Sequence, residues 1–174
     1  VDREKILAKF RNGSSRLLIT TDLASRGLDI PEIKYIIHYH LPPAEDAFTH
    51  RNGRTARMHA SGTAFIIVSE DEQLPDYLDL TIPVFGLGKH LQKPSLPEWE
   101  TLFIGGGKKD KINKVDIVGF LSKQAQLEKN DIGLIEVKDF FAYAAVKRTK
   151  VKSILNAIQG EKIKNKKVKF DVVR

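Results

Sequence analysis

The chain has 174 residues, and its 29 lysines and arginines exceed its 22 acidic residues to give a net charge of +7 at neutral pH. It contains no cysteine, which excludes a disulfide framework and a thiolate metal site. No apolar run approaches the roughly 18 residues of a membrane span, so we expect a soluble cytoplasmic protein of one or two domains.

The first eighty residues alternate helix and strand patterns. Short apolar runs that end in polar or proline residues are typical of strands buried in a parallel sheet. Pro42 and Pro43 end the second such run, and Gly53 fits the C-terminal end of the next helix. The pattern predicts an α/β unit with a parallel sheet. Its predicted elements are a helix over residues 1–10, strands over 16–22 and 34–41, a helix over 44–52 and a strand over 62–69.

Two polar segments are placed where predicted elements end. The first reads TTDLASRGLDI over residues 20–30, and the second reads HRNGRTAR over residues 50–57. Arginine keeps its charge at cellular pH and its planar fork matches phosphate oxygens, so clustered arginines suit a polyphosphate. Ligands of parallel sheets bind beyond the carboxyl ends of the strands, where the first segment lies. The alternative is a solvated helix end, with Arg26 and Asp22 as a structural ion pair.

Charge divides the chain into two unlike parts. Residues 1–100 carry 12 lysines and arginines against 14 acidic residues, a balance of −2, whereas residues 101–174 carry 17 against 8, a balance of +9. A strongly basic unit has the electrostatic footprint of nucleic-acid binding. Residues 81–100, which contain prolines and glycines without a long period, are predicted as a linker after a short helix over 74–80.

The basic part has its own element order. Asn113, with Asp116 three residues on, is typical of a helix start, and apolar residues at helical spacing precede Gly160 in a second helix. The predicted order is βαββαβ, the arrangement of an RNA-recognition module. The elements are strands over 101–104, 132–137, 140–147 and 168–172, with helices beginning at 113 and 151.

Side-chain alternation places Phe103, Phe141 and Tyr143 on one face of this predicted sheet. Unpaired bases stack on such aromatic platforms, each for about 1–3 kcal/mol, although rings at these positions also suit a core. Basic residues offer a second surface, because so many lysines on one unit favour phosphate contacts. The sequence leaves open which surface binds a nucleic acid. The basic candidates are Lys108, Lys109, Lys111, Lys147, Arg148, Lys162 and Lys164.

The order strand, TTDLASRGLDIP, strand, HRNGRTAR resembles motifs V and VI in the second RecA-like domain of DEAD-box RNA helicases. The resemblance implies a two-domain motor that uses ATP and Mg²⁺. The sequence has neither a Gly-x-x-x-x-Gly-Lys-Ser/Thr phosphate loop nor an Asp-Glu-Ala-Asp run. We therefore expect the C-terminal part of a longer helicase, whose first RecA-like domain supplies the phosphate cradle and the Mg²⁺ ligands. This part alone is expected to be inactive.

The resemblance also implies roles for individual residues. Arg57 is the expected arginine finger on the γ-phosphate, with Arg54 beside it, and both would stabilise charge on the transferred phosphoryl group. The motif V aspartate, Asp29, would accept a hydrogen bond from the ATP ribose. The remaining expectations are coupling of ATP to the interdomain interface by His50, Arg51 and Gly53, and contact with the RNA backbone by Thr21, Arg26 and Gly27.

The basic part resembles the tail domain of the DbpA group of bacterial DEAD-box helicases. The segments GGKKDKI over residues 106–112, DIVG over 116–119 and GEKIKNK over 160–166 carry the resemblance. It implies binding of a structured ribosomal RNA hairpin and a role in assembly of the large ribosomal subunit. The group usually has Pro-Gly where Lys114 and Val115 stand, which leaves the exact RNA target open.

The sequence thus predicts part of an ATP-dependent RNA helicase of α/β class. Residues 1–80 form a partial RecA-like parallel sheet with helices, residues 81–100 a linker, and residues 101–174 a small α+β RRM-like domain. Its partners would be structured RNA and the first RecA-like domain, with no membrane and no resident metal site. Two alternatives stay open: a cold-shock DeaD-type helicase with broader RNA choice, and a non-catalytic RNA-binding adaptor.

Overall fold

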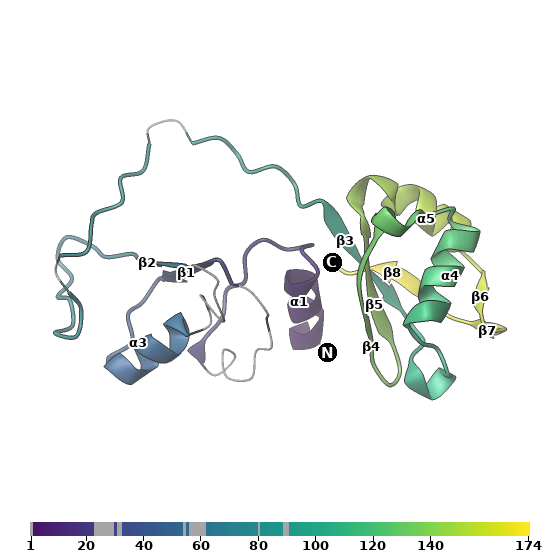
Figure 1. Cartoon of the computed structure of the whole chain (residues 1–174), viewed down its shortest axis with the longest axis horizontal. Coiled ribbons are helices and arrows are strands. Elements are labelled where there is room, and N and C mark those ends of the chain that lie inside the picture. Colours follow the sequence, from purple (N-terminus) through teal and green to yellow (C-terminus); the bar gives the residue numbers. More distant parts are fainter. Residues whose placement is uncertain are drawn as a thin grey trace. The chain divides into compact units, whose positions relative to one another are not determined.

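A computed structural model describes residues 2–22, 30, 33–53, 55, 62–79, 81–88 and 91–174 of the chain. They belong to two compact units, which Figure 1 shows in the colours of the sequence. One unit spans residues 19–93, and the other joins residues 1–18 to residues 94–174. Within the described parts of the chain, no helix combines the length and the apolar character that crossing a membrane requires.

The unit of residues 19–93 is built on two parallel strands. β1 (Tyr35–His38) pairs with β2 (Thr63–Ile66) from Tyr35 opposite Thr63 to His38 opposite Ile66. The helix α3 (Glu45–Asn52) connects them in sequence, and Gly53 caps it by donating its N–H to the Thr49 carbonyl at 2.8 Å. Parallel neighbours need such a crossover connection. The predicted strand, helix and strand are confirmed, although both strands are shorter than predicted.

Two other predictions for this half are wrong. Residues 17–21 are irregular and not a buried strand, with Leu17 and Ile19 exposed. A strand needs neighbours for its backbone N–H and C=O groups, and the sheets formed by the described residues offer this segment no partner. Residues 76–78 form turns in place of the predicted short helix. There the Asp79 carboxylate accepts the Thr81 backbone N–H at 2.9 Å, a local bond that competes with helix formation.

The other unit contains a four-stranded antiparallel sheet in the order β4-β5-β3-β8. These strands are β3 (Trp99–Ile104), β4 (Ile132–Val137), β5 (Ala142–Lys147) and β8 (Phe170–Val172). With α4 (Lys114–Gln124) and α5 (Val151–Ile158), they confirm the predicted βαββαβ order. Additional short elements are η1 (Lys108–Asp110), η2 (Lys129–Asp131), η3 (Arg148–Lys150) and a hairpin of β6 (Lys162–Ile163) and β7 (Lys166–Lys167).

The main core lies between one face of this sheet and the two helices, as Figure 1 shows. Ile117 and Leu121 of α4 and Ile154 of α5 are fully buried against it. The predicted start of α4 is confirmed, because the Asn113 side chain accepts the Asp116 backbone N–H at 3.0 Å and the Asp116 carboxylate accepts the Asn113 N–H at 2.8 Å. These reciprocal bonds satisfy two N–H groups that a helix start leaves without partners.

The opposite face of the sheet is covered by α1 (Asp2–Arg11), which confirms the helix predicted at the start of the chain. Ala8 is buried with Tyr143 and Val173, and Phe103 and Phe141 pack at the margin of this cluster. Figure 1 shows α1 on the side of the sheet away from α4. The fold therefore places a helix in front of the predicted aromatic platform.

Gly107 makes the closest backbone approach in this unit and supports a stability prediction. A methyl group at this position would meet the Asp139 carbonyl oxygen and the Phe141 nitrogen at 2.7 Å. Because both are backbone atoms, we expect Gly107→Ala to cost about 1–3 kcal/mol of unfolding free energy, as overpacking does. The measurement is denaturant unfolding followed by fluorescence of Trp99, the single tryptophan of the chain.

Gly119 on α4 is the matched control, because a methyl group there meets nothing within 4 Å. Gly119→Ala is expected to stabilise by about 0.4–1 kcal/mol through a less flexible unfolded chain. Equal stability of the two variants would contradict the close approach at Gly107.

Candidate nucleic-acid interface

Three predicted basic residues lie on the loop that follows β3. Lys108 and Lys109 donate their backbone N–H groups to carbonyls of the β4–β5 turn at 2.9 and 2.8 Å, which fixes the loop against the sheet. Lys111 follows in the left-handed region, with φ of 59°. The side chains of all three are exposed, and none has an ion-pair partner among the described residues. Their charges are therefore directed to solvent from an anchored backbone.

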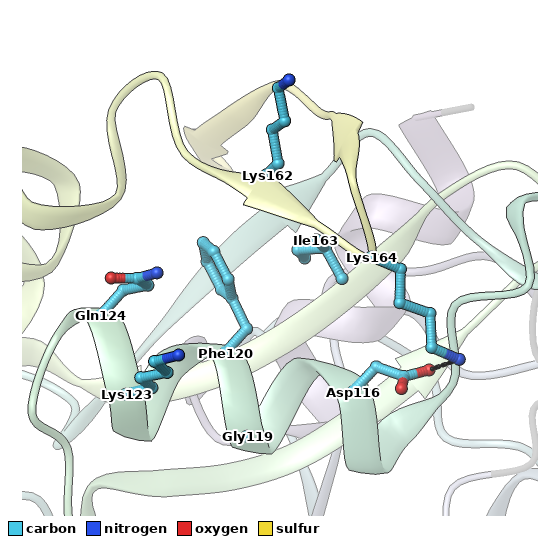
Figure 2. Close-up of a pocket in the computed structure, with 8 residues that line it drawn as sticks. All are labelled: Asp116, Gly119, Phe120, Lys123, Gln124, Lys162, Ile163 and Lys164. Carbon is cyan, nitrogen blue, oxygen red and sulfur yellow. Dashed lines mark ion pairs between the residues drawn. The ribbon is translucent and has the colours of Figure 1, made fainter.

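The β6–β7 hairpin brings further lysines to the same side. Lys164 pairs with Asp116 at 2.8 Å and donates to the Lys111 carbonyl at 2.9 Å, while Lys166 pairs with Asp110 of η1. These contacts hold the hairpin, α4 and the loop together as one basic surface. A pocket of about 240 Å³ opens between the hairpin and α4 (Figure 2). Its lining residues are Asp116, Gly119, Phe120, Lys123, Gln124, Lys162, Ile163 and Lys164.

Lys147 and Arg148 differ from the other basic candidates because both are engaged within the protein. Lys147 pairs with Glu98, and its ammonium group lies 4.7 Å from the centroid of the Trp99 ring. Arg148 pairs with Glu100 at 2.5 Å and donates to the Pro97 carbonyl at 2.6 Å. Partners of this kind lower the charge available to a phosphate. Both side chains hold the start of β3 against the end of β5.

The three aromatic residues meet as predicted on one face of the sheet. The ring centroids of Phe103 and Phe141 are 5.9 Å apart, and Tyr143 lies 6.1 Å from Phe103 and 5.3 Å from Phe141. However, Tyr143 is only 1% exposed, because Ala8 of α1 packs over it. Burial also raises the pKa of the Tyr143 hydroxyl above its usual range. With α1 in this position, a base cannot reach the face of the Tyr143 ring.

The lysine–aspartate pairs of the hairpin give the unit a predicted pH dependence. The hydrogen bond from Lys164 lowers the pKa of Asp116, and that from Lys166 lowers the pKa of Asp110, below the ordinary value of 3.8. A pKa lowered by folding stabilises the protein above the unfolded value, and this stability is lost as the pH falls through the folded value. We expect thermal stability to fall as the pH drops below 3.8.

Asp116→Asn is the matched variant for this effect, because asparagine keeps the acceptor oxygen for the Asn113 N–H but loses the charge. Its melting temperature is expected to lie below that of the parent at neutral pH and to converge with it below pH 3.8. A difference that is the same at all pH values would show that the charge of Asp116 contributes nothing.

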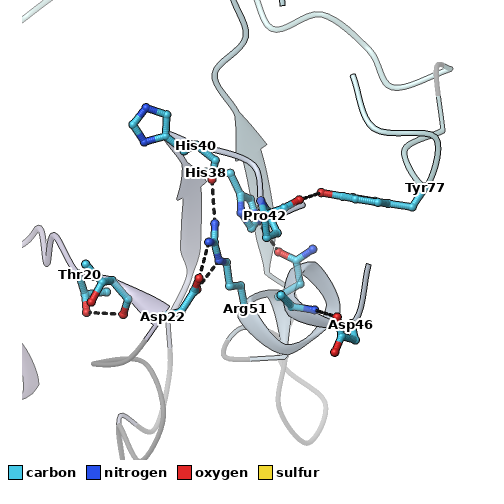
Figure 3. A network of polar contacts seen from close by, with 11 residues as sticks. Thr20, Asp22, His38, His40, Pro42, Asp46, Arg51 and Tyr77 are labelled. Atoms are coloured by element: carbon cyan, nitrogen blue, oxygen red, sulfur yellow. Dashed lines mark hydrogen bonds and ion pairs between the residues drawn. The ribbon is translucent and has the colours of Figure 1, made fainter. Parts of the chain in front are cut away.

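In the unit of residues 19–93, an ion pair joins the two predicted motif segments (Figure 3). Arg51 donates to both carboxylate oxygens of Asp22, at 2.5 and 2.7 Å, and to the His40 carbonyl at 2.8 Å. The hydrogen bond to Asp22 raises the pKa of Arg51 above its ordinary value. A bidentate arginine–carboxylate pair fixes geometry as well as charge. The structure shows Arg51 as a partner of Asp22, whereas the alternative ion pair of Asp22 with Arg26 involves a residue outside those that the structure describes.

His38 is a buried residue of this region that the sequence prediction did not include among the site residues. It is 2% exposed, its Nε2 lies 2.8 Å from the Asn52 side-chain oxygen, and its ring lies 4.7 Å from the Phe48 ring. The contact fixes the end of α3, and so the start of HRNGRTAR, against β1. The only feature of the sequence that could have indicated the burial of His38 is the alternation along β1, because every second side chain of a strand faces the packed side of the sheet.

The remaining predicted residues of this unit divide into two groups. Thr21 and His50 are exposed, and Gly53 is the C-cap of α3. Arg26, Gly27, Asp29, Arg54 and Arg57 lie outside the residues that the structure describes. Among the described residues, no three histidine, aspartate or glutamate side chains form a group that could hold a metal ion.

Comparison with known proteins assigns both halves of the chain to families. Residues 1–59 match the model of the helicase conserved C-terminal domain, and residues 101–172 match that of the DbpA RNA binding domain. Residues 101–172 therefore belong to the DbpA RNA binding domain family, and residues 1–59 belong to the helicase conserved C-terminal domain family. The ion-paired Asp22 and Arg51 lie within the residues that match the helicase domain, and the basic surface lies within those that match the DbpA domain.

Two relatives match nearly the whole length of this chain. The chain is 34% identical to the ATP-dependent RNA helicase DbpA of Escherichia coli over 95% of its own length and 37% of that protein. It is 29% identical to the DbpA protein of Bacillus subtilis over 98% of its length and 41% of that protein. It also shares 48% identity over 39% of its length with the ATP-dependent RNA helicase mak-5 of Neurospora crassa. The chain spans about two fifths of the length of the DbpA relatives.

Proposed function

We propose that this chain is the C-terminal part of an ATP-dependent RNA helicase that binds structured ribosomal RNA through residues 101–174. The whole enzyme would remodel this RNA in the cytoplasm during assembly of the large ribosomal subunit. The observation that carries the proposal is the anchored basic surface of η1, α4 and the β6–β7 hairpin within the matched DbpA domain. The specific DbpA match favours this function over a cold-shock type helicase with broader RNA choice.

The exposed lysines support RNA binding along the basic flank. Lys108, Lys109 and Lys111 have charges free of described acidic partners, and they lie on a loop whose backbone is held by hydrogen bonds. A fixed backbone reduces the ordering cost of binding. Lys162 and Lys164 extend this flank, although Lys164 must exchange its contact with Asp116 for a phosphate. The aromatic residues Phe103, Phe141 and Tyr143 remain a second proposed surface, which is open to bases only without α1.

For the ATPase reaction we keep the roles implied by motifs V and VI. Arg57 and Arg54 would stabilise charge on the γ-phosphoryl group, and Asp29 would accept a hydrogen bond from the ATP ribose. The Asp22–Arg51 pair supports a coupling role for this region, because it ties the two motif segments together. The remaining proposed residues are His50 and Gly53 for coupling, and Thr21, Arg26 and Gly27 for the RNA backbone.

ATP is the proposed nucleotide, and its Mg²⁺ would be held by residues of the parent protein outside these 174. Carboxylate oxygens are the protein ligands that Mg²⁺ prefers, and the described residues contain no cluster of them that could hold a metal. The chain also spans only 37% of its Escherichia coli relative, which leaves room for a first RecA-like domain. Along the sequence we further propose the division into residues 1–80, a linker over 81–100, and residues 101–174, although β3 already begins at Trp99 and residues 1–18 fold with the C-terminal unit.

The proposal predicts that the purified chain shows RNA binding without ATP turnover. RNA-stimulated phosphate release should stay at background, since the phosphate cradle and the metal ligands are supplied elsewhere, while filter binding should detect a complex with large-subunit ribosomal RNA. The control is the full-length parent assayed with the same RNA. Turnover by the chain that disappears in Arg57→Ala would contradict the division of the active site. An inactive full-length parent would favour the adaptor function.

A further inference from the structure

The sheet face that holds the aromatic triad Phe103, Phe141 and Tyr143 carries acidic groups, which distinguishes it from the basic flank. Glu136 lies directly opposite Tyr143 on β4, and Asp171 lies opposite Phe103 on β8, so both carboxylates belong to this face. Carboxylates beside the rings repel the phosphates of a nucleic acid and attract a cationic partner. The chemistry of this face therefore fits a basic protein segment better than an RNA strand.

Helix α1 has the matching charge and shape. Its sequence DREKILAKFR has a balance of two positive charges, and its last turn holds Lys9 and Arg11. The Arg11 guanidinium donates to both carboxylate oxygens of Glu136 at 2.7 Å, and both side chains are four-fifths buried. Ala8, which is 1% exposed, lets the helix approach the rings closely. A bidentate pair of this kind sets orientation as well as energy.

The turn after α1 is bound to the sheet by a buried polar network. The Asn12 side-chain amide donates to the Thr101 hydroxyl of β3 at 2.8 Å, and this hydroxyl donates to the Ser14 hydroxyl oxygen at 2.8 Å. The Ser14 backbone N–H in turn donates to the Asn12 side-chain oxygen at 3.1 Å. All three side chains are buried. Buried polar groups that satisfy one another specify a single packing arrangement.

We propose that this sheet face is a docking site for α1, through which the helicase part of the sequence contributes a helix to the RNA-binding unit. Residues 1–59 match the helicase domain, yet residues 1–18 fold with the unit that holds the DbpA domain. While α1 is docked, bases are excluded from Tyr143, and release of α1 exposes the triad. The inference concerns a contact within the chain and does not depend on ATPase activity or on the RNA bound.

The test uses thiol reactivity, because the chain has no cysteine of its own. Two positions on α1 form a matched pair: Ala8 is 1% exposed against the sheet, and Ile6 is 52% exposed. In the full 174-residue chain, Ala8→Cys should react with a maleimide at least about tenfold more slowly than Ile6→Cys, since only local opening exposes it. Equal rates would overturn the proposal.

A sheet-side change shows whether the protection comes from this face. Adding Glu136→Arg, which sets like charge against Arg11, should raise the rate of the Ala8→Cys chain to nearly that of Ile6→Cys. Lys138→Gln is the control, because the Lys138 ammonium lies 3.5 Å from the Glu136 carboxylate but belongs to the β4–β5 turn and not to α1. It should leave the protection unchanged. Protection that survives Glu136→Arg would mean that α1 packs elsewhere, and would overturn the proposal.

A second measurement avoids introduced thiols. A methyl group at Gly13 would lie 3.4 Å from the Trp99 ring, so the turn after α1 shields this indole. Acrylamide quenching of Trp99 fluorescence should increase at least about twofold in Glu136→Arg and remain at the parent level in Lys138→Gln. Identical quenching in the parent and Glu136→Arg would contradict docking of the turn even if the cysteine variants fold poorly.

Discussion

In the RNA helicase that we propose as the full-length protein, Arg57→Lys is expected to lower kcat for RNA-stimulated ATP hydrolysis by about 10³-fold or more. Lysine keeps the charge but presents a point-like ammonium group, whereas the arginine fork meets two phosphoryl oxygens at once. The loss should appear mainly in kcat, since the contact strengthens as charge spreads over the transferred group. Steady-state phosphate release at saturating RNA and ATP measures the effect.

RNA binding provides the internal control for Arg57→Lys. Its charge is unchanged and the proposed RNA surface lies in residues 101–174, so the affinity for ribosomal RNA should equal that of the parent. Arg54→Lys is the matched variant, with the same chemical change three positions away. Near-normal turnover by Arg57→Lys, together with a large loss in Arg54→Lys, would assign the finger to Arg54.

Local signals in the sequence were sufficient for most elements of the C-terminal unit. The capping pair of Asn113 and Asp116, and the helical spacing of Ile154 and Ile158, depend on neighbours within one or two turns, so pattern alone locates both helices. The β6–β7 hairpin was not predicted, because its strands are two residues each and its turn uses positive φ at Lys164 and Asn165. Lysine does not signal a turn, and a single asparagine is a weaker turn signal than glycine.

Contacts between distant segments could not be predicted from the sequence. Alternation placed Phe103 and Tyr143 on one face, but nothing in a strand pattern says that a helix more than ninety residues earlier covers it. The same limit applies to the charges. Lys147 and Arg148 read as part of a basic cluster, and only the fold shows that Glu98 and Glu100 neutralise them. Composition gives the net charge of a unit, whereas the fold decides which charges face solvent.

Replacing Lys108, Lys109 and Lys111 together by glutamine is expected to weaken ribosomal RNA binding by about a hundredfold at 0.1 M salt. The reason is that each phosphate that is no longer neutralised reduces the slope of log K against log salt by roughly 0.7–0.9. All RNA sequences should be affected alike, since phosphates carry no sequence information. The fold should persist, because these side chains have no described ion-pair partners and the loop is held through its backbone. Titrations at two salt concentrations measure both quantities.

The triple replacement by arginine is the matched control, because it keeps all three charges and should keep the salt slope.

Phe141→Ala addresses the aromatic surface. It leaves the charge unchanged, so its salt slope should equal that of the parent, and a loss of about 1–3 kcal/mol in binding would appear only if bases stack on the ring. With α1 docked over Tyr143, we expect the glutamine variant to lose far more affinity than Phe141→Ala. The reverse order, with a steep slope retained after the three lysines are gone, would move the RNA from the basic flank to the aromatic face. It would also require α1 to leave the sheet when RNA binds, which the reactivity of a cysteine at position 8 would report directly.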